Sequence, residues 1–186
     1  MDLLDFAKKV RELKDLKRTG WVQRGVSDPE SVADHSFMLA ILAYVYSKKM
    51  GLDSEKAVKM ALIHDICEAY CGDIADRLRD EDQVVPDSKK SEMEREGMKK
   101  IVSFLPGDLA SEIQDLWEDF ENRKSKESEL VKDLDKLDMC MQAKEYSKKL
   151  EKSRLEEFFE VAERDIKTPE IRKVFEKIFR EFKGEA

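Results

Sequence analysis

The sequence predicts an all-α fold, a single-domain helical bundle of about seven to eight helices. Three observations predict it. Apolar residues recur at intervals of three and four along most of the chain, which is the spacing of a helix that buries one face. Strand-like alternation of apolar and polar residues is nearly absent. The 186 residues are enough for one apolar core, so we expect residues 1–186 to form one domain.

Two helices are predicted before Gly51. The first covers residues 3–16, and a loop with several glycine and proline residues is expected over 19–30. Either Asp28 or Ser31 can cap a second helix, because a short polar side chain accepts hydrogen bonds from the N–H groups of the first turn. Gly51 is expected to end this helix, since glycine readily adopts the left-handed conformation found after a helix C-terminus.

A third helix is predicted from Asp53 or Ser54 to Gly72. It carries the segment "EKAVKMALIHDICEAYC", which is apolar apart from a few charged residues and one histidine. Residues 74–87 are rich in charge and contain Pro86, so a loop is expected there.

The second half of the chain is also predicted to be helical. Two shorter helices are expected within 151–182, the last one capped by Thr168 with Pro169 in its first turn. The final dozen residues are highly charged and are expected to fray. The other predicted helices cover residues 88–105, 108–121 and 127–150.

The charge balance disfavours a surface that binds nucleic acid polymers. Lys and Arg number 35 against 42 Asp and Glu, a formal net charge of -7. A small anionic ligand held by a few local cations is compatible with this balance. The N-terminus does not resemble a signal peptide, and no window of about 18 apolar residues could span a bilayer. We therefore expect a cytoplasmic protein without a membrane partner, and three cysteines do not suggest a disulfide scaffold.

The chain has only two histidines, His35 and His64, and each stands next to an aspartate in an apolar helical segment. Neighbours in a helix point about 100° apart, so His64 and Asp65 do not share a face, and two ligands reaching one ion is the natural interpretation. Imidazole and carboxylate ligands suit Mn²⁺, Co²⁺, Fe²⁺ or Zn²⁺. A histidine on an apolar helix is also commonly a core residue, and that alternative stays open here.

A further ligand is expected in "ELVKDLDKLDMCMQA", because a mononuclear catalytic site uses about four protein ligands. Asp135 and Asp138 stand three residues apart at the margin of an apolar stripe. A carboxylate there needs a partner that offsets its desolvation, and a metal cation is a good one. On periodicity alone, solvated ion pairs with Lys132 and Lys136 are an equally good interpretation.

Three segments resemble a known family. "LKRTGWVQRGVSDPESVADHS", "ALIHDICEAYCGDIAD" and "ELVKDLDKLDMCMQAKEY" are similar to the HD-domain metal-dependent phosphohydrolases. Within them the chain resembles the YfbR-like 5'-deoxynucleotidases, most of all their HD-domain-containing protein 2 branch, over roughly residues 3–150. The resemblance implies an HD domain with its metal-site core at about 31–150 and C-terminal helices at 151–182. It also implies hydrolysis of deoxyribonucleoside 5'-monophosphates by a homodimer that uses Co²⁺, Mn²⁺ or a similar ion, with Zn²⁺, Fe²⁺ or Mg²⁺ as alternatives.

The resemblance also implies roles for individual acidic residues. Glu68 matches the family's catalytic glutamate, although an exposed partner of His64 one helical turn away is the alternative interpretation. Asp73 matches an aspartate beside the substrate, placed to contact a sugar hydroxyl or to assist proton transfer. The metal ligands that match are His35, His64, Asp65 and Asp135.

The family places an arginine on the phosphate and a tryptophan against the sugar, and Arg18 and Trp21 match them. In the bacterial enzymes these two residues are adjacent, whereas this chain inserts Thr19-Gly20, so the strength of deoxy over ribo selectivity is left open. Trp21 as an ordinary core aromatic is the alternative. Lys89 at the start of the fourth predicted long helix, with Lys90, can add positive charge near the phosphate, or both can be solvated.

Other functions remain open on the sequence. The same metal site could act on a nucleoside triphosphate, a cyclic nucleotide or guanosine tetraphosphate. A non-catalytic metal-binding or nucleotide-binding helical module is a further alternative. Cys67 and Cys71 could be half of a zinc site, but only Cys140 remains to complete it, so we interpret them as small buried residues. The apolar run over 38–45 and the group at 158–161 are interpreted as core or dimer packing.

Overall fold

Helices dominate the computed structural model, which describes residues 3–75 and 85–185. Within these ranges the backbone forms no strand, only an isolated antiparallel bridge between Lys17 and Ser31, so the all-α prediction is confirmed. Eight described helices of at least seven residues agree with the predicted number. The elements are α1 (Leu3–Arg11), η1 (Glu12–Lys14), α2 (Thr19–Arg24), α3 (Val32–Met50), α4 (Ser54–Ile63), α5 (Glu68–Cys71), α6 (Asp87–Val102), α7 (Gly107–Asn122), α8 (Lys126–Tyr146), η3 (Lys152–Arg154), α9 (Glu156–Asp165) and α10 (Pro169–Lys183).

The helix ends follow the predicted chemistry best in α3. The Ser31 side chain accepts a hydrogen bond from the Asp34 backbone N–H, and the Asp34 carboxylate accepts one from Ser31 in return. Gly51 follows with φ of 69°, the left-handed conformation expected there. Asp53 caps α4 in the same way, by accepting from the N–H groups of the next turn.

The predicted third helix is wrong as a continuous element. It divides into α4 and α5, with a turn at residues 64–67 between them. The carbonyl of His64 accepts a hydrogen bond from the Trp117 indole at 3.2 Å, while the Glu68 N–H donates to Asp65 at 3.0 Å instead. A side chain of α7 therefore binds the His64 carbonyl, which a continuous helix would have used for its own backbone hydrogen bond. The apolar periodicity of the segment gives no information about this contact with another helix.

Two predictions at the ends of the chain also need correction. The expected loop over 19–30 contains the short helix α2, and the final residues do not fray before Lys183. Phe182 is buried, and its ring stacks on Phe159 with 4.1 Å between the centroids, so the amphipathic face of α10 is held by packing. Pro169 lies in the first turn of α10 as predicted, and Thr168 occupies the N-cap position, although its side chain forms no capping hydrogen bond. Most of the loop expected over 74–87 lies outside the described residues.

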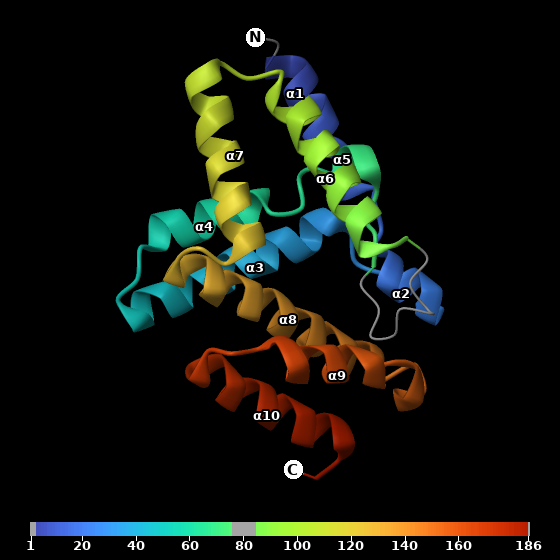
Figure 1. Cartoon of the computed structure of the whole chain (residues 1–186). Coiled ribbons are helices and arrows are strands. Elements are labelled where there is room, and N and C mark those ends of the chain that lie inside the picture. Colours follow the sequence, from blue (N-terminus) through green and yellow to red (C-terminus); the bar gives the residue numbers. More distant parts are fainter. Residues whose placement is uncertain (1–2, 76–84, 186) are drawn as a thin grey trace.

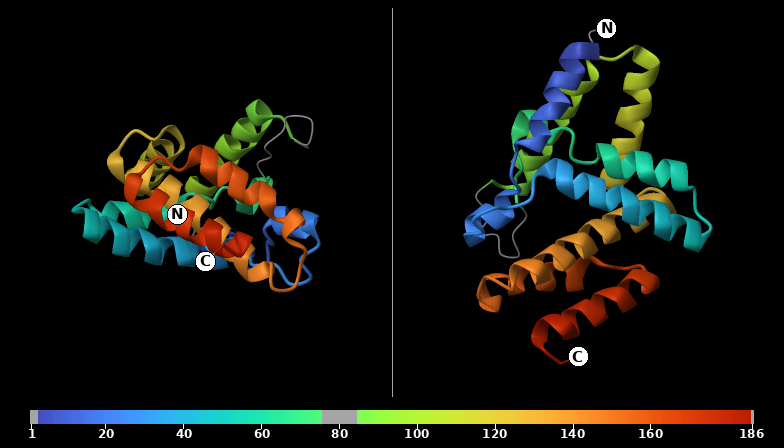
Figure 2. Two further views of the ribbon diagram at one scale, coloured as in Figure 1. Left: turned by 90° about the horizontal axis from the view of Figure 1, so that it is seen from below. Right: turned by 180° about the vertical axis from the view of Figure 1, so that it is seen from behind.

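The helices form two groups on either side of α3 and α4. Figure 1 shows α1, α6 and α7 on one side of this pair and α8, α9 and α10 on the other, and Figure 2 shows the same arrangement from behind. The larger apolar core lies between α3, α4, α8 and the C-terminal helices, and a smaller one lies under α1, α5 and α6. The turn between α4 and α5 lies between these cores. None of the described helices combines the length and apolar character that crossing a bilayer requires.

Candidate metal centre and active site

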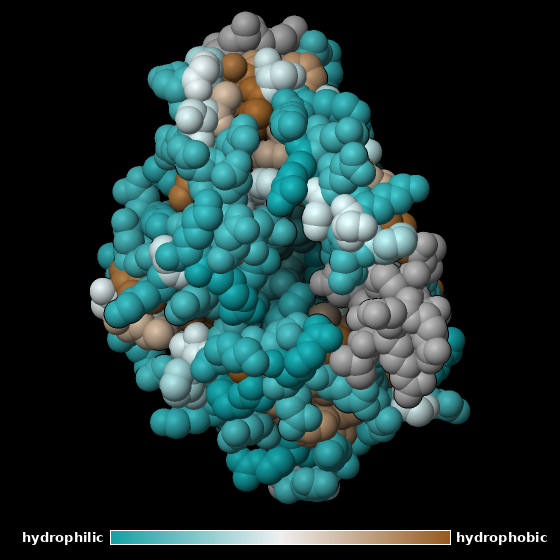
Figure 3. Space-filling model, viewed as in Figure 1, coloured by the Kyte–Doolittle hydropathy of each residue, from teal (hydrophilic) through white to brown (hydrophobic). Residues whose placement is uncertain are grey.

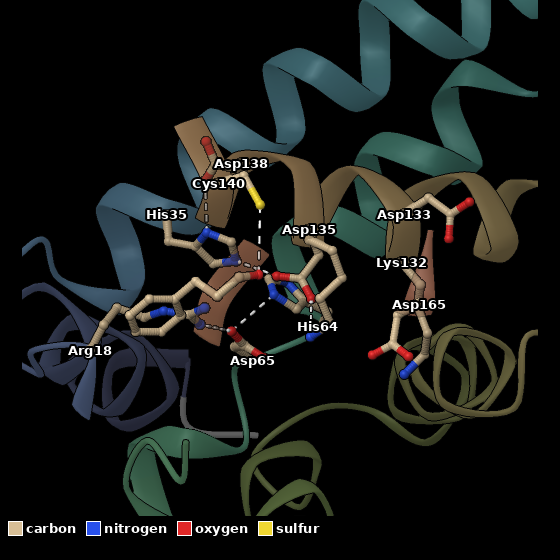
Figure 4. A network of polar contacts seen from close by, with 12 residues as sticks. Arg18, His35, His64, Asp65, Lys132, Asp133, Asp135, Asp138, Cys140 and Asp165 are labelled. Carbon is tan, nitrogen blue, oxygen red and sulfur yellow. Dashed lines mark hydrogen bonds and ion pairs between the residues drawn. The ribbon is translucent and has the colours of Figure 1, made fainter. Parts of the chain in front are cut away.

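Both histidines lie in the interior and face each other. His35 comes from α3 and His64 from the end of α4, and their ring centroids are 5.3 Å apart. Asp135 reaches the same point from α8 (Figure 4). One ligand atom from each of these residues lies within 4.8 Å of the other two. The fold therefore brings together three of the four predicted metal ligands, from α3, the end of α4 and α8.

Hydrogen bonds fix the orientation of both imidazoles. Nδ1 of His35 lies 2.8 Å from Asp138 Oδ2, and Nδ1 of His64 lies 2.8 Å from the backbone oxygen of Ala61. Each Nδ1 is thus the donor, and each Nε2 presents a lone pair towards Asp135 and Asp65, respectively. Both Nε2 atoms are buried, and neither forms a hydrogen bond with a residue that the structure describes.

The donor set therefore fits a divalent cation. The carboxylate oxygen of Asp135 lies 3.1 Å from His35 Nε2, and that of Asp65 lies 2.9 Å from His64 Nε2. Two electron-rich atoms this close require a positive charge between them, either a proton or a metal ion. Burial and Arg18 lower the pKa of His35, but the neighbouring carboxylates of Asp135 and Asp138 outweigh them and raise it to about 9.

Asp65, the fourth predicted ligand, also contacts Arg18. Its Oδ2 lies 3.0 Å from Arg18 Nη1, and Asp73 Oδ1 lies 3.7 Å from the same nitrogen. Burial acts to raise the pKa of Asp65, but His64 and Arg18 hold it well below its usual range. Arg18 is itself only partly exposed, and the two aspartates that flank α5 hold this cation at the site.

Asp73 holds the segment that carries Arg18. Its carboxylate accepts a hydrogen bond from the Thr19 backbone N–H, and its backbone oxygen accepts one from the Thr19 hydroxyl at 2.7 Å. The inserted Thr19 thus ties the start of α2 to the end of α5. Asp73 lies at the site as predicted, and these contacts show it positioning the Arg18 segment.

Glu68 is buried at the start of α5, one turn after His64. Its Oε2 forms no hydrogen bond with a described residue. Burial, and then the charges of Asp65 and Asp73, raise its pKa well above the usual value. The exposed surface position considered from the sequence is therefore wrong, and the carboxyl group is suited to hold a proton.

These residues surround a cavity of about 450 Å³, a size that suits a small organic ligand. Arg18, Trp21 and Glu68 line it together with three of the predicted metal ligands, His64, Asp65 and Asp135. Lys89 is exposed on α6 and does not line it, whereas Lys90 does. Figure 3 shows that the face seen in Figure 1 is mostly hydrophilic.

Trp21 combines the two interpretations given to it from the sequence. Only 2% of its surface is exposed, as in a core residue, and yet its ring lines the cavity. Phe158 on α9, expected to be core or dimer packing, lies beside it on the cavity wall. This wall could not be predicted from the sequence, because the contact between Trp21 of α2 and Phe158 of α9 depends on the tertiary fold.

Asp138 is the second residue whose role was missed. Asp135 and Asp138 are both buried, so the solvated ion pairs considered for them are wrong, although Lys136 does lie 3.1 Å from Asp135. Spacing of three residues placed the two carboxylates on one face of α8, but only the fold shows that Asp138 contacts His35. The three cysteines are free, and none belongs to the group of potential ligands among the described residues.

Comparison with known proteins agrees with this geometry. A family model described as HD domain matches residues 10–174. The chain is 40% identical to the 5'-deoxynucleotidase HDDC2 of Homo sapiens over 170 residues, which cover 91% of this chain and 80% of the relative. It is 33% identical over 153 residues to the 5'-deoxynucleotidase hdd1 of Schizosaccharomyces pombe, covering 80% of this chain and 74% of that protein.

Solved structures show the same fold. A protein from Pyrococcus horikoshii superposes with a TM-score of 0.76 at 34% identity, covering 98% of this chain and 99% of that one. A conserved hypothetical protein from Pyrococcus furiosus gives a TM-score of 0.75 at 34% identity, covering 95% and 99% of the two chains.

Proposed function

The chain belongs to the HD domain family, and on this premise we propose that it hydrolyses deoxyribonucleoside 5'-monophosphates to deoxynucleoside and phosphate in a metal-dependent reaction. One observation carries the proposal: Nε2 of His35 and Nε2 of His64 face the carboxylates of Asp135 and Asp65, beside a cavity that the partly buried Arg18 also lines. The relatives named 5'-deoxynucleotidase support the substrate class.

His35, His64, Asp65 and Asp135 would hold the metal ion. Nitrogen and carboxylate donors suit Co²⁺, Mn²⁺, Fe²⁺ or Zn²⁺, with Mg²⁺ a less natural match for two imidazoles. When bound, the ion supplies a Lewis acid that activates water and offsets the charge of the phosphate.

Arg18 binds the phosphate. A guanidinium presents paired N–H groups that match two phosphate oxygens, and on an acidic chain such a local cation is required to attract the anion. Asp65 and Asp73 hold its head group at the cavity in the absence of substrate. Of the two lysines expected to add positive charge near the phosphate, Lys89 and Lys90, only Lys90 lies on the cavity wall, so this role is assigned to Lys90.

Glu68 donates a proton to the leaving 5'-oxygen. Burial and the charges of Asp65 and Asp73 raise the pKa of Glu68, which favours the protonated carboxyl group, and the leaving 5'-oxygen needs a proton when its bond to phosphorus breaks. Glu68 lines the same cavity as Arg18, so it can reach a phosphate held there. A contact of Asp73 with the sugar remains a prediction from the family.

We also propose a homodimer. The outer face of α3 exposes four large apolar side chains at helical spacing, Phe37, Ile41, Tyr44 and Val45, and 66% of Phe37 is exposed. A stripe of this kind can pack against its own copy about a two-fold axis. Light scattering at micromolar concentration tests this, and a monomer throughout would refute it. The cytoplasmic location stays a prediction from the sequence.

Phosphate release tests the function. Chelator-stripped protein should regain activity on dAMP when Mn²⁺ or Co²⁺ is added, with lower activity on AMP. Turnover of dATP or a cyclic nucleotide in place of dAMP would keep the metal chemistry and replace the substrate. No turnover with Mn²⁺, Co²⁺, Mg²⁺ or Zn²⁺ would favour the non-catalytic module.

A further inference from the structure

The Trp21 side chain is fixed by three neighbours. Its Nε1 donates a hydrogen bond to Glu30 Oε1 at 2.9 Å. The Tyr146 ring meets it edge to face with 5.2 Å between centroids, and the Phe158 ring lies 4.2 Å away in a tilted arrangement. Because the indole N–H is already used, Trp21 presents only ring carbon atoms to the cavity.

Glu30 links this ring to the phosphate-binding segment. Its backbone oxygen accepts a hydrogen bond from the Arg18 N–H at 3.1 Å, and its backbone N–H donates to the Tyr146 hydroxyl at 2.8 Å. Both ends of the residue are thus anchored, so its side chain approaches Trp21 from a fixed backbone. Glu30 immediately precedes Ser31, the cap of the helix that carries His35.

The inserted glycine lets Phe158 complete the wall. A Cβ atom at Gly20 would lie 3.3 Å from Phe158 Cε1 and 3.9 Å from the Cβ of Ala75, so a larger residue would push the aromatic ring away. Gly20, Trp21, Ala75 and Phe158 all line the cavity. This side of the cavity is therefore apolar, whereas Arg18 and Glu68 contribute charged and polar groups to the same cavity.

We propose that Glu30 is a positioning residue for sugar selectivity, which holds Trp21 so that its ring carbons and Phe158 form one apolar wall against carbon 2' of the sugar. A 2'-hydroxyl placed on this wall would lose its hydrogen bonds with water and find no partner, so the ribonucleotide is disfavoured. The inference rests on the proposed function, and it adds Glu30 and Phe158 to the tryptophan that the family resemblance places against the sugar.

Replacing Glu30 tests the proposal. Glu30→Leu removes the acceptor at similar volume, and we expect it to lower the ratio of kcat/KM for dAMP over AMP about tenfold, mainly through KM. Glu30→Gln keeps an oxygen that accepts the indole N–H and should retain the ratio. Val22→Ala, at an exposed position of α2, is the matched control. A Glu30→Leu ratio equal to that of the wild type, with or without a common loss of rate, overturns the proposal.

A second readout does not depend on activity. The chain has two tryptophans, so a ¹⁵N–¹H spectrum shows two indole N–H signals, and Trp21→Phe identifies the relevant one. In Glu30→Leu this signal should shift and lose its protection against exchange with D₂O. In Glu30→Gln the signal should keep its position and its protection. An unchanged, protected signal in Glu30→Leu overturns the positioning role. If the wild type hydrolyses no nucleotide, the proposed function fails, and the sugar selectivity falls with it, but this signal still decides whether Glu30 holds Trp21.

Discussion

Nδ1 of His35 lies 2.8 Å from Oδ2 of Asp138, and both side chains are buried. This contact fixes the tautomer of the imidazole, so that Nε2 keeps its lone pair for a metal ion. Asp138→Ala should weaken Mn²⁺ or Co²⁺ binding about 10–100-fold, whereas Asp138→Asn, which keeps an acceptor, should lose less. Calorimetric titration of the metal-free variants measures this, with Glu129→Gln, exposed on the same helix, as the control. Wild-type affinity in Asp138→Ala would refute the role.

Removing a metal ligand should abolish both metal retention and turnover. Asp65→Ala is the informative case, because Asp65 contacts Arg18 as well as lying 2.9 Å from His64 Nε2. If Asp65 binds the metal, elemental analysis after dialysis will find the variant empty. Metal content equal to the wild type would instead leave Asp65 with the single role of holding Arg18.

Glu68→Gln should keep the metal and the fold and lower kcat about 10²–10⁴-fold, the usual contribution of a positioned general acid or base. The amide has the same shape as the carboxyl group but cannot give up a proton. Steady-state kinetics on dAMP and metal analysis of the same sample test both halves of the expectation. Glu96→Gln, on the exposed face of α6, is the control, and a Glu68→Gln rate near that of the wild type would remove Glu68 from the mechanism.

The sequence predicts those features of the fold that short-range chemistry determines. Ser31 and Gly51 bound α3 as expected, because a cap and a left-handed glycine act on their own turn. The break at residues 64–67 was not predictable, since it depends on the Trp117 indole from α7.

The same division applies to the site. The types and spacing of His35, His64 and Asp135 predicted a metal centre, and the fold brings them together. The residues that orient them were missed, because an aspartate that pairs with histidine 103 positions away looks like any other aspartate in the sequence. Phe158 was likewise predicted as packing, and its place on the cavity wall follows from its contact with the Trp21 ring.

Asp133 on α8 is fully buried, and its replacement should reduce the stability of the fold. Its carboxylate accepts hydrogen bonds from Arg123 Nη1 at 2.9 Å and from the backbone N–H groups of Lys167 and Thr168, at 2.8 and 2.6 Å, so it connects α7, α8 and the start of α10. Asp133→Ala leaves these donors without their partner and should lower the free energy of unfolding by about 3 kcal/mol. Urea denaturation measures this loss.

Measuring the activity per folded molecule of Asp133→Ala separates a loss of stability from a loss of catalysis. Asp133 does not line the cavity, so the kcat of the folded fraction of Asp133→Ala should equal that of the wild type. Asp133→Asn should fall between the two in stability, because its amide oxygen can satisfy only part of the set. If Asp133→Ala unfolds at the wild-type urea concentration, the connection between α8 and α10 contributes nothing. If its stability is lost together with kcat in the folded fraction, the C-terminal helices help to shape the site through more than the wall formed by Phe158.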